Sequence, residues 1–106
     1  MVITEYVSDP KSVAEKAYEK HGGSTNYSEM VRNVISLVPG LTVKYHETFG
    51  TWRVTHKFEI EDVESGDVYE FSLAYGSCAV WDTLLAARGN KGDIIRFYLH
   101  ILQNIG

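Results

Sequence analysis

Histidines, lysines and an arginine gather in the middle of the chain, where they alternate with apolar residues. Histidine is the usual general acid or base near neutral pH, and cations repeated at strand spacing can contact phosphates. Alternation places one set of side chains on the same face of a predicted hairpin: Lys44, His46, Arg53, Thr55 and Lys57. This set predicts a surface for nucleic acid or, near His46 and Arg53, a cleft for a ligand or substrate. A solvated face with cross-strand ion pairs is the simpler interpretation, because several glutamates lie nearby.

Catalysis by these histidines lacks a complete set of partners in the sequence. His46 and Glu47 are adjacent on a strand, so their side chains point to opposite faces. His56 falls on the apolar face, where we expect a hydrogen-bonded core histidine. Cys78 begins a predicted helix, where a helix dipole can activate a thiol, but packing as a small apolar residue explains it more simply. The chain has none of the common hydrolase, zinc-protease, calcium-loop or nucleotide-binding motifs, so we expect no metal and no cofactor.

A second group of cations precedes the last predicted helix, in the segment Arg88-Gly89-Asn90-Lys91-Gly92-Asp93. Backbone N–H groups and the helix dipole converge at such a position and can bind an anion. Asp93 would add negative charge at the same point, and a turn between two helices explains the segment more simply. A nucleic-acid interface would use Arg88 and Lys91 together with the cations of the sheet.

The elements that position these residues follow from the hydrophobic periodicity. Apolar residues at helical spacing predict helices over 10–21, 26–38, 77–88 and 90–105. Between the second and third helices the period changes to two, which predicts three antiparallel strands over 41–46, 52–61 and 68–75. This order (helix, helix, three-stranded meander, helix, helix) is typical of an α+β domain whose helices cover the aromatic face of the sheet. The β-branched residues near the N-terminus allow an additional edge strand: Val2, Ile3, Thr4 and Val7.

The last predicted helix is apolar on nearly all sides, and such a helix is buried on more than one side. Its apolar residues include Phe97, Tyr98, Leu99, Ile101, Leu102 and Ile105. In a domain this small, the sheet and the other helices can leave part of the helix uncovered. That surface predicts an interface for self-association or for a protein partner, with a central core helix as the equal alternative.

Composition limits the classes of function. The chain has 106 residues, 44% of them hydrophobic and 23% charged, which excludes a disordered chain and fits one domain over 1–106. Its net charge of −4 argues against a general polyanion binder. The N-terminus lacks the basic region of a signal peptide, and no segment approaches the ~20 apolar residues of a membrane span. The single cysteine fits a reducing compartment, so we expect a cytoplasmic protein.

Three functions remain, in a definite order. The first is a non-enzymatic binding protein, such as an inhibitor, an immunity-type protein or an accessory subunit. It would use the last helix, exposed aromatic residues as anchors, and the acidic segment 59–64 against a basic partner surface. The second is a nucleic-acid-binding module that uses the polar sheet face. The third is a small enzyme or ligand binder with a cleft between sheet and helices.

Overall fold

A computed structural model describes residues 2–24, 26–74, 80–88 and 90–106, with the backbone alone at 87 and 88. The helices are α1 (Pro10–His21), α2 (Tyr27–Ile35) and α4 (Lys91–Asn104), with a short 3-10 turn, η1 (Ile3–Glu5), and a π-helical segment, η2 (Thr83–Arg88). The strands β1 (Leu41–Phe49), β2 (Thr55–Asp62) and β3 (Val68–Leu73) form one antiparallel sheet in the order β1-β2-β3. The predicted α+β class and element order are confirmed.

The helices begin at polar side chains that accept hydrogen bonds from their first turns. Asp9 accepts from the backbone N–H of Ser12 at the start of α1, and Asn26 accepts from Glu29 at the start of α2. Asn90 accepts from the backbone N–H of Asp93 at the start of α4. These caps satisfy N–H groups that have no partner within the helix. Among the described helices, none is long and apolar enough to cross a bilayer.

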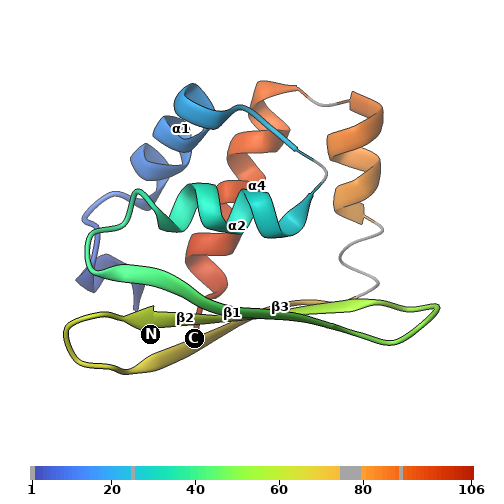
Figure 1. Cartoon of the computed structure of the whole chain (residues 1–106). Coiled ribbons are helices and arrows are strands. Elements are labelled where there is room, and N and C mark those ends of the chain that lie inside the picture. Colours follow the sequence, from blue (N-terminus) through green and yellow to red (C-terminus); the bar gives the residue numbers. More distant parts are fainter. Residues whose placement is uncertain (1, 25, 75–79, 89) are drawn as a thin grey trace.

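All the helices lie on one side of the sheet, and the opposite face is uncovered (Figure 1). The covered, inner face is lined by alternate strand residues whose side chains are almost fully buried: Phe58, Ile60, Phe71 and Leu73. These residues join the apolar sides of α1, α2 and α4 in one hydrophobic core. The sheet therefore has two chemically different surfaces, and only the outer one is free for contact along its whole width.

Helix α4 is the central helix of this core, which corrects the prediction of an interface. Its contacts are with α1, α2 and η2, and it crosses between the other helices in Figure 1. Of the residues assigned to the interface, Leu99 is partly buried. The others are 0–3% exposed: Phe97, Tyr98, Ile101, Leu102 and Ile105. The hydroxyl of Tyr98 donates to the Gly22 carbonyl (2.7 Å) and so ties α4 to the end of α1. The sheet and the other helices therefore cover these side chains, which the sequence had left open between a core and an interface.

The N-terminal segment is not an edge strand. Ile3 begins η1, and its side chain is 7% exposed within the core. Tyr6 then donates a hydrogen bond from its hydroxyl to the carboxylate of Asp62 (2.8 Å), at the end of β2. The residue that does pair with the edge of β3 is Gly106, which exchanges two backbone hydrogen bonds with Glu70 (3.1 and 2.9 Å). Burial of Ile3 outweighs the β-branched character of the segment.

Candidate functional site

A β-bulge in β1 decides which side chains reach each face of the sheet. Val43 pairs with Ile60 and Tyr45 pairs with Glu59, so Lys44 is an extra residue without a partner across the strand. Beyond the bulge the alternation is reversed. Tyr45 therefore lies on the outer face and His46 on the inner face. The prediction that His46 shares a face with Lys44, Arg53 and Lys57 is wrong for this reason.

The inner face beyond the bulge holds a pair of histidines. Nε2 of His46 and Nδ1 of His56 are 3.1 Å apart, within hydrogen-bonding distance. The ring of His46 stacks on Phe58 with 4.2 Å between the ring centroids. His46 lies opposite Phe58 and His56 lies opposite Thr48, so the two histidines form a diagonal pair across β1 and β2. The expectation that His56 is hydrogen-bonded is confirmed.

The residues around this pair come from α2 and from the segment after β3. Tyr27, at the start of α2, places its ring edge against His56 (5.4 Å between centroids) and donates its hydroxyl to Asp82. Burial lowers the pKa of His46 below its usual value, and the positive potentials of His56 and Arg32 lower it further. Burial also lowers the pKa of His56, although Asp82 acts in the opposite direction. Both rings are therefore held in their neutral forms near pH 7.

The described contacts of this cluster are hydrogen bonds and ring contacts between side chains of the inner face, α2 and the segment after β3. The described residues include no group of three histidine, cysteine or carboxylate side chains that could hold a metal ion. Arg53 lies outside the strands and is exposed, whereas His46 is half-buried on the inner face. Cys78, considered above as a thiol at a helix start, lies outside the described residues.

The outer face carries more negative than positive charge. Its lysines are both paired, Lys44 with Glu61 (3.7 Å) and Lys57 with Glu70 (3.6 Å). Glu47 lies opposite Lys57 and accepts a hydrogen bond from the Tyr45 hydroxyl (2.9 Å), which raises the pKa of Tyr45. Glu59 on β2 adds a fourth carboxylate to this face. The predicted basic surface is thus an acidic one, with cross-strand ion pairs. Moreover, the segment 59–64 is not a loop, because β2 continues to Asp62.

Large aromatic side chains are exposed on the same outer face and at the adjoining hairpin. Tyr45 is 46% exposed and Phe49 is 48% exposed, while Trp52 in the loop between β1 and β2 is 91% exposed. Gly50 turns the chain before Trp52 with a φ of +88°, and a Cβ there would lie 2.7 Å from the Arg53 carbonyl oxygen. Glycine is therefore required for the tight turn that holds Trp52 in solvent.

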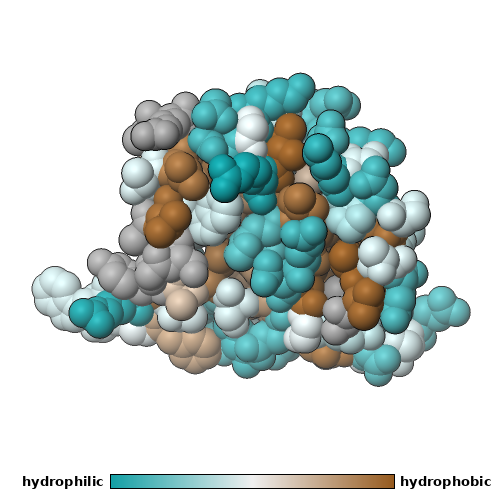
Figure 2. Space-filling model, turned by 180° about the vertical axis from the view of Figure 1, so that it is seen from behind, coloured by the Kyte–Doolittle hydropathy of each residue, from teal (hydrophilic) through white to brown (hydrophobic). Residues whose placement is uncertain are grey.

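The hairpin extends this aromatic surface beyond the body of the molecule. In Figure 1 the β1–β2 turn reaches past the helices on the right, and in Figure 2 it projects at the lower left of the rounded body. We define the outer surface as the face and tip formed by these residues: Lys44, Tyr45, Glu47, Phe49, Trp52, Lys57, Glu59, Glu61 and Glu70. Its aromatic members went unrecognised as a group, since plain alternation assigned Tyr45 and Trp52 to the core.

The second predicted anion site has little positive charge available in the described part of the chain. The ammonium group of Lys91 lies over the ring of Tyr18, 5.6 Å from its centroid. Asp93 is 8% exposed, accepts a hydrogen bond from the Asn90 amide and forms an ion pair with Arg96 (3.6 Å), so a carboxylate occupies the first turn of α4. The side chain of Arg88 lies outside the described residues. The described polar groups of this segment therefore stabilise the first turn of α4.

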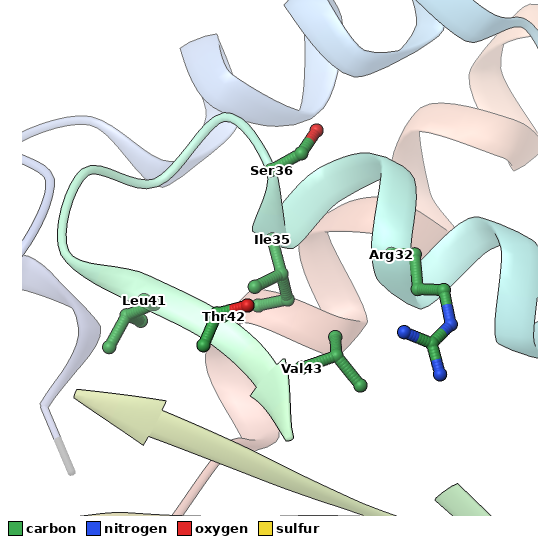
Figure 3. Close-up of a pocket in the computed structure, with 6 residues that line it drawn as sticks. All are labelled: Arg32, Ile35, Ser36, Leu41, Thr42 and Val43. Atoms are coloured by element: carbon green, nitrogen blue, oxygen red, sulfur yellow. The ribbon is translucent and has the colours of Figure 1, made fainter. Parts of the chain in front are cut away.

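A hollow between α2 and β1 is shown in Figure 3. Arg32 extends from α2 over Val43 of β1, with Ile35 and Ser36 on the helix side and Thr42 on the strand. The volume of this hollow is about 170 Å³. Pockets for small ligands usually hold ~300–1,000 Å³ and close around the ligand. This hollow is therefore too small for a typical cofactor, and neither histidine of the pair lines it.

Comparison of the chain with protein families, with curated proteins and with solved structures gave no match. The two surfaces of the sheet differ in what they leave available for contact. The inner one is engaged in the core, and the outer one is exposed, acidic and aromatic.

Proposed function

We propose that this chain is a non-enzymatic protein-binding domain, which docks its outer surface against a basic region of a partner protein. The observation that carries the proposal is Trp52, 91% exposed at a hairpin tip beside the half-exposed Phe49. Tryptophan and tyrosine are the residue types that most often anchor protein interfaces. An inhibitor, an immunity-type protein or an accessory subunit would act in this way, and we place it in the cytoplasm.

Charge supports a basic partner. The outer surface presents Glu47, Glu59, Glu61 and Glu70 against Lys44 and Lys57, with Arg53 in the adjoining loop, and the whole chain has a net charge of −4. Complementary charge steers association and suppresses partners of the wrong sign. A phosphate backbone would instead meet the carboxylates that pair with both lysines. The charge balance therefore favours a protein over a nucleic acid.

The experiment compares capture of partners from a lysate of the source organism by four forms of the chain. One variant removes the aromatic anchors (Phe49→Ser with Trp52→Ser), and a second reverses charge on the outer surface (Glu47→Lys with Glu59→Lys). The matched control, Glu15→Lys with Glu19→Lys, makes the same change of charge on the exposed side of α1.

We expect one basic protein to be retained by the wild type and by the control, to elute as salt rises, and to be lost by both outer-surface variants. Retention of every captured protein by both outer-surface variants would contradict the proposal. Capture of an acidic protein, or of nucleic acid whose binding survives the charge reversal, would contradict it as well.

A further inference from the structure

The histidine pair on the inner face lies in the same hairpin that carries Trp52. His46 precedes the hairpin turn on β1 and His56 follows it on β2, so their contact joins the two arms close to the tip. At this position Tyr27, at the start of α2, places its ring edge against His56. The arrangement of the aromatic tip thus depends on a contact between two titratable rings.

That contact requires at least one neutral imidazole. A neutral ring has one N–H donor and one accepting nitrogen, whereas a protonated ring has two donors and no acceptor. With Nε2 of His46 and Nδ1 of His56 at 3.1 Å, a first proton can be shared between the rings. A second proton leaves two donors and two positive charges face to face. The pair therefore takes up its protons in coupled steps.

The charged groups around the pair do not compensate for a second proton. Arg32 of α2 adds positive potential at His46. Asp82 adds negative potential at His56, but the positive charge of Arg32 offsets it across the pair, so a second proton adds an uncompensated charge. The remaining described contact of His46 is the apolar ring of Phe58. Acidification therefore weakens the contact between the rings of His46 and His56.

We propose that the His46–His56 contact is a pH-dependent latch, which holds the β1–β2 hairpin ordered near neutral pH and releases it on acidification. The coupling to binding rests on the proposed function, because an ordered hairpin presents Phe49 and Trp52 to a partner without a further loss of conformational entropy. The expected outcome is partner release under acidic conditions.

The first experiment uses the free chain and needs no partner. Amide protection factors are measured at pH 7.5 and 5.0 for residues 46–49 and 55–58. Residues 59–61, which lie farther from the tip and pair with both β1 and β3, serve as the internal reference. The control is the double variant His46→Gln with His56→Asn, whose side-chain amides occupy the positions of Nε2 and Nδ1 but do not titrate. We expect protection near the tip to fall about tenfold in the wild type, which corresponds to ~1.4 kcal/mol in the opening equilibrium.

In the control variant, protection near the tip stays level between the two pH values. Level protection in the wild type, or an equal fall in the control, would overturn the latch. The second experiment measures affinity for the captured basic partner at both pH values. Weakening in the wild type but not in the control supports the coupling, and equal pH dependence in both forms overturns it. Failure to find a partner contradicts the binding proposal and leaves the protection experiment decisive for the latch.

Discussion

The two faces of the sheet place the same kinds of side chain in opposite environments. On the inner face Phe58 is fully buried and stacks with His46, whereas on the outer face Phe49 is 48% exposed near the hairpin tip. The glutamates that pair with the lysines, Glu61 on β2 and Glu70 on β3, both lie on the outer face. The inner face therefore stabilises the fold, and the outer surface is available for recognition.

The largest expected effect comes from making one substitution on both faces. Phe58→Ala leaves a cavity in the core and should lower the free energy of unfolding by ~3–5 kcal/mol. Phe49→Ala removes an exposed side chain and should change it by no more than about 0.5 kcal/mol. Urea unfolding of both variants measures the difference. Similar losses would mean that the two faces are not distinct in burial.

The next largest effect is the pH dependence of stability that the two histidines of the inner face cause. Burial lowers the pKa values of His46 and His56 in the folded chain, so the unfolded chain binds more protons once the pH falls below the ordinary histidine value of ~6.5. The stability contributed by the neutral pair is present above that pH and is lost as the pH falls toward the lowered pKa values.

Urea midpoints measured between pH 7.5 and 5.0 should therefore decline for the wild type. The double variant His46→Gln with His56→Asn should give a flatter curve over the same range. A wild-type midpoint that rises on acidification would contradict the assignment of the two histidines to the inner face.

The smallest effect is expected from the ion pairs of the outer face. Lys57 and Glu70 approach to 3.6 Å, with 30% and 54% of their side chains exposed. A double-mutant cycle with Lys57→Met and Glu70→Gln should give a coupling of ~0.2–1 kcal/mol, reduced at high salt. A coupling of several kcal/mol would show that these charges hold the sheet together instead of forming a solvated surface.

Much of the fold could be predicted from the sequence because local signals and packing agree there. Asn26 and Asn90 cap their helices as predicted, and the period of two in β2 correctly places Phe58 and Ile60 in the core. The bulge at Lys44 could not be predicted, because tyrosine and histidine are both amphipathic and fit either face. Alternation thus assigned Tyr45 inward and His46 outward, the reverse of the structure.

The environment of the last helix depends on long-range packing, which the sequence does not report. Its apolar residues fit a core or an interface equally well until α1 and α2 are placed against it. The candidate site was predicted in part, since an acidic segment and exposed aromatic anchors were expected. The acidic and aromatic residues lie on one surface because of the bulge in β1 and the turn at Gly50, and both of these are features of the backbone.

The most direct test of the outer surface is site-specific photo-crosslinking in cells of the source organism. A photoreactive aromatic amino acid, which keeps a large ring at the hairpin tip, replaces Trp52. In a matched form the same amino acid replaces Lys16 on the exposed side of α1. We predict a discrete crosslink to a basic protein from position 52, absent from position 16 and abolished by Glu47→Lys with Glu59→Lys. Equal crosslinking from both positions, or no crosslink from position 52, would contradict the assignment of the outer surface as the site of recognition.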